Sequence, residues 1–564
     1  MPSELDARLG AIIDALTAPG ASAETARFER GGVPCTVLKD APASLPALFE
    51  RYCTQFGPAE FLVDGEVRLT FAQTLALARS VAGGLIARHG VKKGDRIGIA
   101  ARNSASWIIA YMGVAMAGGC ATLLNGWWTG EELAEGIALA ECTLVLADAQ
   151  RTARIDGRAG NARVIVFDHG APEAGLAPLL GETVPLPEVS ADDLATILFT
   201  SGSTGTAKGA VSDHRGKVHG TLSYAVQSLA MLTHLTGQGL VPPPQQCALV
   251  GVPLFHVTGE VPLFLQSFVI GRKLVLMPRW DPLEAMRLME AEKVTYFVGV
   301  PLMSHEIAMH PDRARYDLSH CLFFAAGGAP RPVEHVGRIR AALPHAWPIL
   351  GYGLTETNAV GCGNFNENYL AKPGSTGPAS RPLVEVAIFD DGGQPLAQGT
   401  TGEVAIRSIA NVLGYWRNPQ ATAAAFLPGG WFLTGDLGYL DGDGYLFIVD
   451  RKKEIIIRGG ENIACIEVEH ALYAHPAVAE ASVFGLPDAR LGEVPVAVWH
   501  AHPGHDLDEE ELRAFLAEHL APFKLPVRLW REAAPLPRLG TEKVDKRALK
   551  ARYAARWSNA TGGG

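Results

Sequence analysis

Short apolar runs rich in β-branched and aliphatic residues recur along the first two thirds of the chain, each followed by a glycine or polar turn and then a helical pattern. Runs of this length without alternation are typical of strands buried on both faces. The run at 96–100, for example, leads into a helical stretch at 104–118. The same pattern predicts strands at 144–148, 164–168, 195–199, 322–326 and 348–350. Strands that alternate with helices indicate an α/β fold with a parallel sheet, whose ligands bind just beyond the strand ends.

The pattern changes after Gly435. Aspartate and glycine dominate 436–444, a strand-like run follows at 445–449, and a charged turn, Asp-Arg-Lys-Lys-Glu, occupies 450–454. Beyond the turn we expect an α+β segment, with helices at 466–474 and 508–520 and strands at 481–485 and 494–500. We therefore predict a large N-terminal multi-layer α/β domain over 1–449, a hinge at 450–454 and a small mobile α+β domain over 455–564. A surface turn within one domain is the alternative reading of 450–454.

Composition and charge narrow the class of protein. The chain has 564 residues, of which 48% are hydrophobic and 19% charged, and its net charge is −10. An acidic balance argues against a nucleic-acid partner, which needs a basic surface. The eight cysteines are scattered without a CxxC pair and indicate reduced thiols in a cytoplasmic protein. The N-terminus lacks the pattern of a signal peptide, and the most apolar segment, 249–271, carries too many polar residues for a membrane span.

The segment 196–209, TILFTSGSTGTAKG, joins an apolar strand to a loop of hydroxyls, glycines and a lysine. Glycines let a backbone approach an anion closely, hydroxyls and amides donate hydrogen bonds, and Lys208 supplies charge. A flexible polar loop is the plain alternative. A Walker A loop fails on spacing, because Ala207 stands where its second glycine belongs and Gly209 where its metal-binding hydroxyl belongs. The segment therefore predicts a phosphate loop of another kind.

This loop resembles the signature phosphate loop of the adenylate-forming superfamily, which includes acyl-CoA synthetases, peptide-synthetase adenylation domains and luciferases. The family's usual proline before the lysine is replaced here by Ala207. The resemblance implies that the loop binds the phosphates of ATP and that Thr204 also binds the metal. The phosphate-binding residues it implies are Thr200, Ser201, Gly202, Ser203, Thr204, Gly205 and Lys208.

Further motifs follow in the family's order. The segment 253–259, PLFHVTG, is similar to the acyl-site motif and places His256 beside the reacting carboxylate, although a histidine in an apolar run is also typical of a hydrogen-bonded core residue.

The segment 327–330, GGAP, resembles the adenine-contacting turn, and its plain alternative is a tight turn. The segment 351–357, GYGLTET, resembles the adenine and metal motif. The resemblance implies adenine contacts from Gly328, Ala329, Pro330, Gly351, Tyr352 and Gly353, an α-phosphate contact from Thr355, and Mg²⁺ binding by Glu356.

The segments 431–436, WFLTGD, and 449–453, VDRKK, resemble the family's ribose-binding pair. The resemblance implies that Asp436 accepts hydrogen bonds from both ribose hydroxyls, that Arg451 donates to them, and that Ile448 contacts the nucleotide. It also implies that Lys453 is the hinge residue. The segment 455–463, IIIRGGENI, is similar to the loop that lines the thiol tunnel, which assigns Gly459 and Gly460 to coenzyme A. The family often has proline where Cys465 stands.

The segment 536–546, LPRLGTEKVDK, resembles the C-terminal catalytic-lysine motif and implies that Lys543 is the catalytic lysine. A glycine usually precedes this lysine, and Glu542 stands in its place. Lys546 and Lys550 lie nearby, so the assignment to Lys543 rests on the register of the motif alone.

Together the motifs predict an ATP- and Mg²⁺-dependent ligase that converts a carboxylic acid to an acyl-adenylate and then to a thioester of coenzyme A. The segment 126–129, the predicted helix at 131–140 and the tract around His256 look most like bacterial fatty-acyl-CoA ligases, although aryl-acid ligases share every motif. A luciferase-type oxygenase, a catalytically inactive homologue and a homodimer remain open. An inactive homologue would be expected to have lost one of the key charged residues, all of which are present: Lys208, Glu356, Asp436 and Lys543. We expect the acyl pocket to draw on Thr258, Gly259, Val298, Gly299 and Met303.

Overall fold

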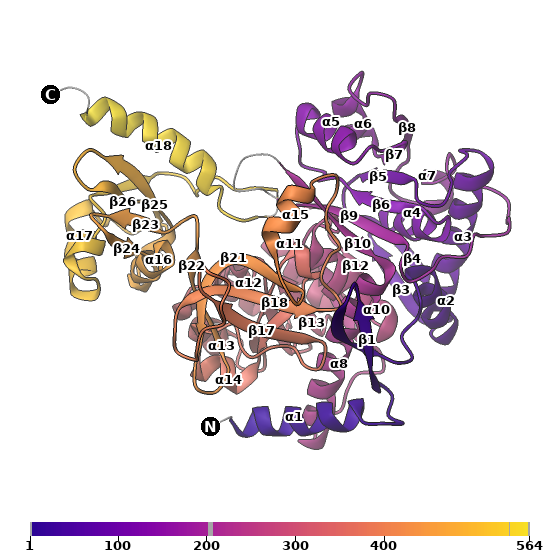
Figure 1. Ribbon diagram of the computed structural model, residues 1–564, viewed down its shortest axis with the longest axis horizontal. Helices are drawn as coiled ribbons and strands as arrows, with labels where there is room; N and C mark the ends of the chain where they lie inside the picture. Colours follow the sequence, from indigo (N-terminus) through magenta and orange to yellow (C-terminus); the bar gives the residue numbers. More distant parts are fainter. Residues whose placement is uncertain (1–2, 201–206, 541, 562–564) are drawn as a thin grey trace.

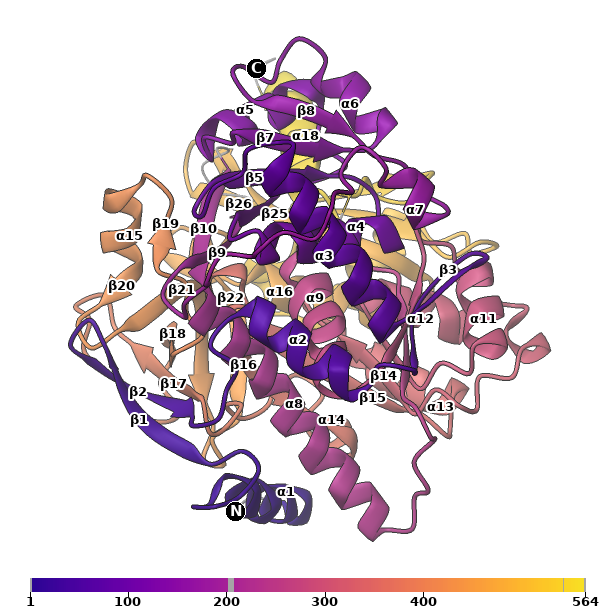
Figure 2. The ribbon, with the colours of Figure 1, turned by 90° about the vertical axis from the view of Figure 1, so that its right-hand side faces the viewer.

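The computed structural model describes residues 3–200, 207–540 and 542–561, and Figure 1 shows a small lobe standing beside a much larger one. The large lobe begins with α1 (Glu4–Thr17), which packs along α8 (His214–Gly237), as Figure 2 shows from the side. The strands β1 (Thr25–Arg30) and β2 (Val33–Leu38) form a hairpin near them. Within the described residues, no helix combines the length and the apolar character needed to cross a bilayer.

The first large sheet has seven strands, of which the five at one side run parallel and the other two antiparallel. Their order is β19 (Gly414–Tyr415), β10 (Lys208–Asp213), β9 (Leu194–Thr200), β6 (Cys120–Leu123), β5 (Arg96–Ala100), β7 (Leu144–Ala147) and β8 (Arg163–Val166). The strands expected at 96–100, 144–148 and 195–199 are present within two residues. We expected a helix after the strand at 195–199. The chain instead forms the antiparallel strand β10 first, so the phosphate loop joins the two strands of a hairpin.

The second large sheet has eight strands. Its order is β16 (Gly361–Asn364), β15 (Trp347–Gly353), β14 (Phe323–Ala326), β13 (Tyr296–Gly299), β11 (Cys247–Val250), β12 (Lys273–Leu276), β3 (Glu60–Asp64) and β4 (Val67–Thr70). The six inner strands are parallel and the two edge strands antiparallel. Both sheets therefore confirm the expected α/β fold, with the antiparallel edges as an addition.

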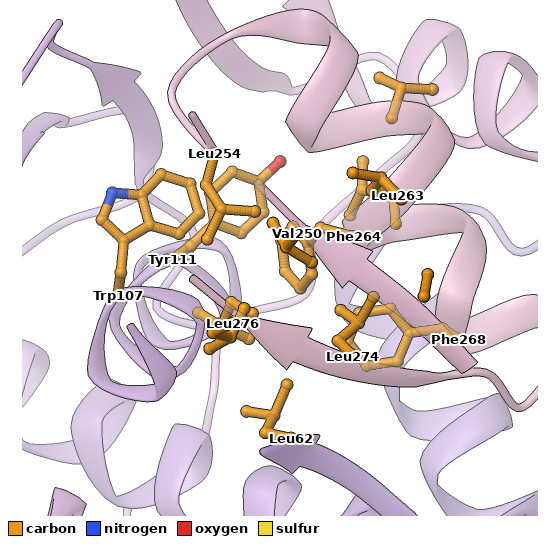
Figure 3. Close-up of a cluster of buried hydrophobic side chains, with 14 of the residues drawn as sticks. Leu62, Trp107, Tyr111, Val250, Leu254, Leu263, Phe264, Phe268, Leu274 and Leu276 are labelled. Atoms are coloured by element: carbon orange, nitrogen blue, oxygen red, sulfur yellow. The ribbon is translucent and has the colours of Figure 1, made fainter. Parts of the chain in front are cut away.

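The two sheets share one apolar core. Every residue of α4 (Ala105–Met116) is buried, which agrees with its apolar sequence and the predicted helix at 104–118. Figure 3 shows Trp107 and Tyr111 of this helix beside leucines of β12 and aromatic side chains that follow β11. The surrounding helices are α2 (Leu45–Gln55), α3 (Phe71–Ala87), α5 (Gly130–Leu139), α6 (Ala149–Ile155), α7 (Pro172–Gly175), α9 (Val257–Gly259), the π-helix η1 (Glu260–Leu265), α10 (Gln266–Val269), α11 (Pro282–Ala291), α12 (Pro301–Met309), α13 (Val333–Ala342) and α14 (Asn366–Ala371).

A third, antiparallel sheet connects the two lobes. It contains β17 (Val384–Phe389), β18 (Gly402–Ser408), β20 (Phe426–Leu427), β21 (Trp431–Leu440) and β22 (Leu446–Arg451), with α15 (Pro419–Ala425) beside it. The chain passes from β22 through the charged turn into the small lobe. There β24 (Glu461–Ile463), β23 (Ile456–Arg458), β26 (Gly492–Ala501), β25 (Val478–Asp488) and β27 (Arg528–Glu532) form a sheet covered by α16 (Cys465–Ala474), α17 (Glu509–His519) and α18 (Lys546–Thr561). This lobe has its own apolar clusters, so the predicted α+β segment is confirmed.

Candidate active site

A cavity of about 2460 Å³ lies where the two lobes meet. Its walls include the ends of β13, β14 and β15, both strands of the β9–β10 hairpin and the segment that follows β22. The small lobe contributes the stretch around Lys543. Open α/β sheets bind ligands beyond the carboxyl ends of their strands, so this is the expected place for an active site.

The described ends of the phosphate loop flank this cavity. Thr200 closes β9 and pairs in register with Lys208, which opens β10. The Nζ of Lys208 lies 4.9 Å from the centre of the Tyr415 ring, a cation–π contact that holds the ammonium beside the cavity. The loop positions Ser201, Gly202, Ser203, Thr204 and Gly205 lie outside the described residues.

Glu356 is the carboxylate best placed for a metal. It lies in the short helix η3 (Thr355–Thr357) directly after β15, is only 8% exposed, and accepts a hydrogen bond from the Tyr415 hydroxyl at 2.8 Å. Burial raises the pKa of Glu356, while Lys208 and Arg451 act against that rise without forming an ion pair with it. Among the described residues no cluster of three or more acidic, histidine or cysteine ligands exists. A single carboxylate suits Mg²⁺, because this ion keeps several waters and takes its other ligands from substrate phosphates.

Replacing Glu356 with glutamine should cripple adenylate formation, since glutamine keeps the size of the side chain and loses its charge. We expect a fall of about 10²–10³ in the rate of pyrophosphate release. The rate should be measured across a Mg²⁺ titration, with Glu367→Gln, a change at an exposed acid of α14, as the control. Near-normal pyrophosphate release from the Glu356 variant at limiting Mg²⁺ would exclude the metal role.

Asp436 and Arg451 lie on adjacent strands and form a polar cluster with Tyr352 of β15. Asp436 of β21 and Arg451 of β22 are register partners, and their Oδ1 and Nε atoms are 3.2 Å apart. The Tyr352 hydroxyl donates to Oδ2 of Asp436 at 2.7 Å. Burial raises the pKa of Asp436, and Arg451 opposes that rise. The cluster offers an oriented acceptor beside a charged donor, which is the chemistry that a pair of ribose hydroxyls requires.

His256, Thr258, Gly328 and Lys543 converge at one point of the cavity. A side chain at Gly328, whose φ is +77°, would place its Cβ 3.4 Å from the Lys543 Nζ and 3.7 Å from the Thr258 Oγ1. Glycine is therefore needed here both for the backbone conformation and for the approach of the lysine. The Nδ1 of His256 accepts the Thr258 N–H at 3.3 Å, so the ring proton is on Nε2. Burial lowers the pKa of His256 to about 3, and Lys543 adds to that effect, so the ring is a neutral donor.

Lys543 should make adenylate formation sensitive to alkaline pH. Burial lowers its pKa to about 8, with Arg451 contributing, so the ammonium is present below that pH and is lost as pH rises through it. We expect the kcat/KM of adenylate formation to fall on the alkaline side of about 8. Lys543→Arg, which stays charged, should be slower but lack this alkaline limb. An unchanged profile in the arginine variant would exclude Lys543 as its cause.

The neighbouring lysine and two positions that depart from the family pattern each have different contacts. Lys546 pairs with Glu469 at 2.8 Å and with Glu454 at 3.4 Å, so its charge is already neutralised inside the small lobe. Glu542 adopts φ +62°, a left-handed conformation that explains why a glycine suits this position. The backbone N–H of Cys465 donates to the Asp450 carboxylate, and its thiol donates to the Glu454 carbonyl oxygen, which ties the start of α16 to the charged turn.

The remaining candidate residues divide into two groups. Gly328, Gly351, Gly353, Thr355 and Lys453 line the cavity. Within the described part of the chain, the lining does not include Ala329, Pro330 or Ile448; Ile448 packs against the cluster around Cys362 and Leu446. Gly459 and Gly460 form the turn between β23 and β24 and also stand apart from the lining. All eight cysteines are free, and seven are buried.

One face of the second sheet forms an apolar floor, of which the sequence predicted only Val298. The register pairs Tyr296 with Phe323, Val298 with Ala325, and Ala325 with Ile349, and all of these side chains border the cavity. Phe297 and Phe324 point to the opposite face, where their rings pack 5.7 Å apart. Of the expected pocket residues, Thr258 and Val298 line the cavity; Gly259, Gly299 and Met303 do not, because Met303 packs beneath Gly299. Apart from Val298, only the run of small residues at 325–327 hinted at this floor.

Comparisons with known proteins find matches over most of the chain. The family described as AMP-binding enzyme matches residues 49–416, and its C-terminal domain matches residues 467–543. A 2-succinylbenzoate–CoA ligase of Geobacillus kaustophilus is 34% identical over 86% of this chain and 94% of its own length. A 3-[(3aS,4S,7aS)-7a-methyl-1,5-dioxo-octahydro-1H-inden-4-yl]propanoyl:CoA ligase of Rhodococcus jostii is 32% identical over 91% and 99%. A long-chain-fatty-acid–CoA ligase of Bacillus subtilis is 31% identical over 86% and 90%.

Solved structures show the same architecture. ATP-bound MatB from Rhodopseudomonas palustris superposes with a TM-score of 0.80 at 29% identity, covering 91% of this chain and 99% of that one. The o-succinylbenzoate coenzyme A synthetase of Bacillus subtilis in complex with ATP and magnesium ion gives 0.77 at 27% identity, covering 89% and 99%.

Proposed function

Because this chain belongs to the family of AMP-binding enzymes and is an AMP-forming acid–CoA ligase, we propose that its acid is a medium- or long-chain fatty acid or an apolar acid of comparable length. The apolar floor carries this proposal. From Gly327 to Phe323 the floor runs four residues, which at about 3.3 Å per residue is roughly 13 Å. An extended carbon chain advances about 1.2 Å per bond, so a tail of about ten carbons matches the floor. A two-carbon acid would leave most of it unfilled.

The first half-reaction joins the acid to ATP. An oxygen of the acid carboxylate attacks the α-phosphorus, the bond from that phosphorus to the pyrophosphate oxygen breaks, and pyrophosphate leaves. Carboxylate and phosphates are all negative, so the reaction needs cations and oriented donors at the point where charge accumulates. In the proposal Lys543 bridges the carboxylate and the α-phosphate, Thr355 donates to that phosphate, and Lys208 faces the outgoing pyrophosphate. The Nε2–H of His256 orients the acid.

Glu356 holds Mg²⁺ in this proposal, and the ion supplies positive charge to the phosphate oxygens when bound. Tyr415 positions the carboxylate through its hydrogen bond at 2.8 Å. Asp436 and Arg451 hold the ribose. These assignments give a role to the buried Glu356, which borders the cavity without an ion pair to another described residue, and to the pair formed by Asp436 and Arg451.

The second half-reaction transfers the acyl group to coenzyme A. The thiolate sulfur attacks the acyl carbon, the bond to the AMP oxygen breaks, and AMP leaves with both electrons of that bond. Gly459 and Gly460 stand apart from the cavity while Lys543 lies inside it. We propose that residues 455–564 rotate about 450–454 between the half-reactions, which withdraws Lys543 and brings this glycine turn to the adenylate.

An aromatic or fused-ring acid is the second candidate. Gly327, Gly351 and Ala325 leave the floor without large side chains near the reacting end. That space suits a flat ring as well as a chain, and two relatives act on ring-bearing acids according to their names.

A panel of acids tests the proposal. CoA-dependent AMP release should be measured with acetate, octanoate, dodecanoate, benzoate and cinnamate. Each buried methylene contributes about 0.8 kcal/mol, so kcat/KM should rise steeply from acetate to the longer acids. A higher kcat/KM with acetate than with octanoate contradicts the proposal, and a clear preference for cinnamate over every fatty acid supports the ring-acid alternative.

A further inference from the structure

Arg272 is a buried cation without an acidic partner at the far end of the floor. It precedes β12, is only 2% exposed, and borders the cavity together with Tyr296. No described carboxylate forms an ion pair with it. Two other buried cations of the large lobe do have one: Lys217 pairs with Glu260 at 2.5 Å, and Arg151 with Asp148 at 3.0 Å.

Neutral groups hold the Arg272 guanidinium in place. Its Nε donates to the Ser267 Oγ at 2.9 Å, and its Nη2 donates to the carbonyl oxygens of Pro262 and Leu263 at 2.7 and 2.9 Å. The guanidinium lies 5.2 Å from the centre of the Tyr296 ring. Burial lowers the pKa of Arg272 to about 10, so it is still charged at neutral pH.

Two donors at this end of the cavity are unused. The Nη1 of Arg272 and the hydroxyl of Tyr296 make no hydrogen bond to any described residue. Neither atom is among the described polar atoms that are both unpartnered and fully buried. Both therefore retain open space beside them, and both residues border the cavity. A buried charge is costly unless something compensates it, so this end of the pocket is built to receive an acceptor.

We infer that Arg272 and Tyr296 form a subsite for an oxygen acceptor, a second carboxylate or an oxo group, at the end of the acid distant from the reacting carboxylate. The inference rests on the proposed function, because it needs the apolar part of the acid to lie along the floor. It narrows the substrate class to apolar acids that carry oxygen at both ends. Tyr296 starts β13 and pairs with Phe323, so the two carboxyl-sized groups would be separated by roughly 13 Å of apolar chain or ring.

The test compares matched acids of eight to fourteen carbons: the plain fatty acid, the α,ω-dicarboxylic acid and the acid with an oxo group on the penultimate carbon. With the unmodified protein we expect kcat/KM for an oxygenated acid to exceed that of the plain acid by about 10- to 100-fold at one chain length, since hydrogen bonds to charged groups are strong. The dicarboxylic and oxo arms identify which acceptor the subsite prefers.

Arg272→Met should abolish this preference while leaving kcat/KM for the plain acid within a few-fold. Arg272→Lys should restore part of it for the dicarboxylic acid, and Tyr296→Phe should reduce it. Lys273→Met is the matched control, because Lys273 is the adjacent cation but pairs with Glu292 at 2.6 Å outside the cavity lining. A purely structural arginine would lower the rates with all acids equally and leave their ratio unchanged.

The outcomes separate the two proposals. Good activity with plain fatty acids and no preference for oxygenated ones at any length overturns the subsite and leaves the proposed function standing. Equal loss with every acid in Arg272→Met and Tyr296→Phe also overturns the subsite. Failure to activate any acid of the series, plain or oxygenated, contradicts both.

Discussion

Replacing Lys543 with alanine should slow adenylate formation by about 10²–10³ while leaving the use of a preformed adenylate almost intact. The Nζ of Lys543 lies near Thr258 and within 3.4 Å of the Cβ position of Gly328, where the acid and the α-phosphate would meet. Its removal deletes a preorganised cation at the point where charge accumulates. The proposed rotation of the small lobe would carry the lysine away from the adenylate, so we expect the thiol step not to depend on it. The measurement is AMP and thioester formation from acid plus ATP, and separately from synthetic acyl-adenylate plus coenzyme A.

Lys546→Ala is the matched control for this prediction. Lys546 is three positions along the same segment, yet it pairs with Glu469 and Glu454. Its loss should change both half-reactions little. Equal slowing of both half-reactions in Lys543→Ala would contradict the alternation of the two lobes. A selective loss of adenylation in Lys546→Ala would show that the register assigned to the motif is wrong.

Replacing Ala325 with phenylalanine should turn the enzyme from long acids to short ones. Ala325 lies in the middle of the floor, between its register partners Val298 and Ile349, so a benzyl group there closes the path to Phe323. About six or seven methylenes of dodecanoate would lose their burial, at about 0.8 kcal/mol each, which corresponds to roughly 10³–10⁴ in kcat/KM. Activity with acetate or butyrate should change by no more than a few-fold.

Ala325→Ser, which adds little volume, serves as the control and should keep the preference for long acids. Overpacking costs about 1–3 kcal/mol, so the Tm of both variants should be measured alongside the kinetics. If Ala325→Phe still activates dodecanoate as well as the unmodified protein does, the acyl tail follows another route. If it loses acetate and dodecanoate activity equally, the change has damaged the site and not the tail pocket.

The sequence determined by itself those features that depend on residues adjacent in the chain. The strand expected at 96–100 is β5 with the same bounds, and that at 322–326 is β14 less one residue, because a short apolar run between turns has few other stable conformations. The phosphate loop, the acid of η3 and the pair Asp436 and Arg451 were assigned from the resemblance of their segments to family motifs, and their roles stay predictions. Chemistry that is carried by a contiguous motif does not need the fold to be recognised.

Only the tertiary structure decided how distant segments meet. Strand β10 turns back antiparallel against β9, where a helix was expected. Its conformation is determined by its pairing with β9 and β19, and not by the local sequence pattern. The placement of Lys543 in the cavity and of Lys546 beside Glu469 follows from the docking of the two lobes. The apolar floor is made by alternate residues of three parallel strands, and Arg272, which precedes β12, borders the same cavity. Strand register and side-chain direction are set by contacts between residues far apart in the chain, and no local pattern records them.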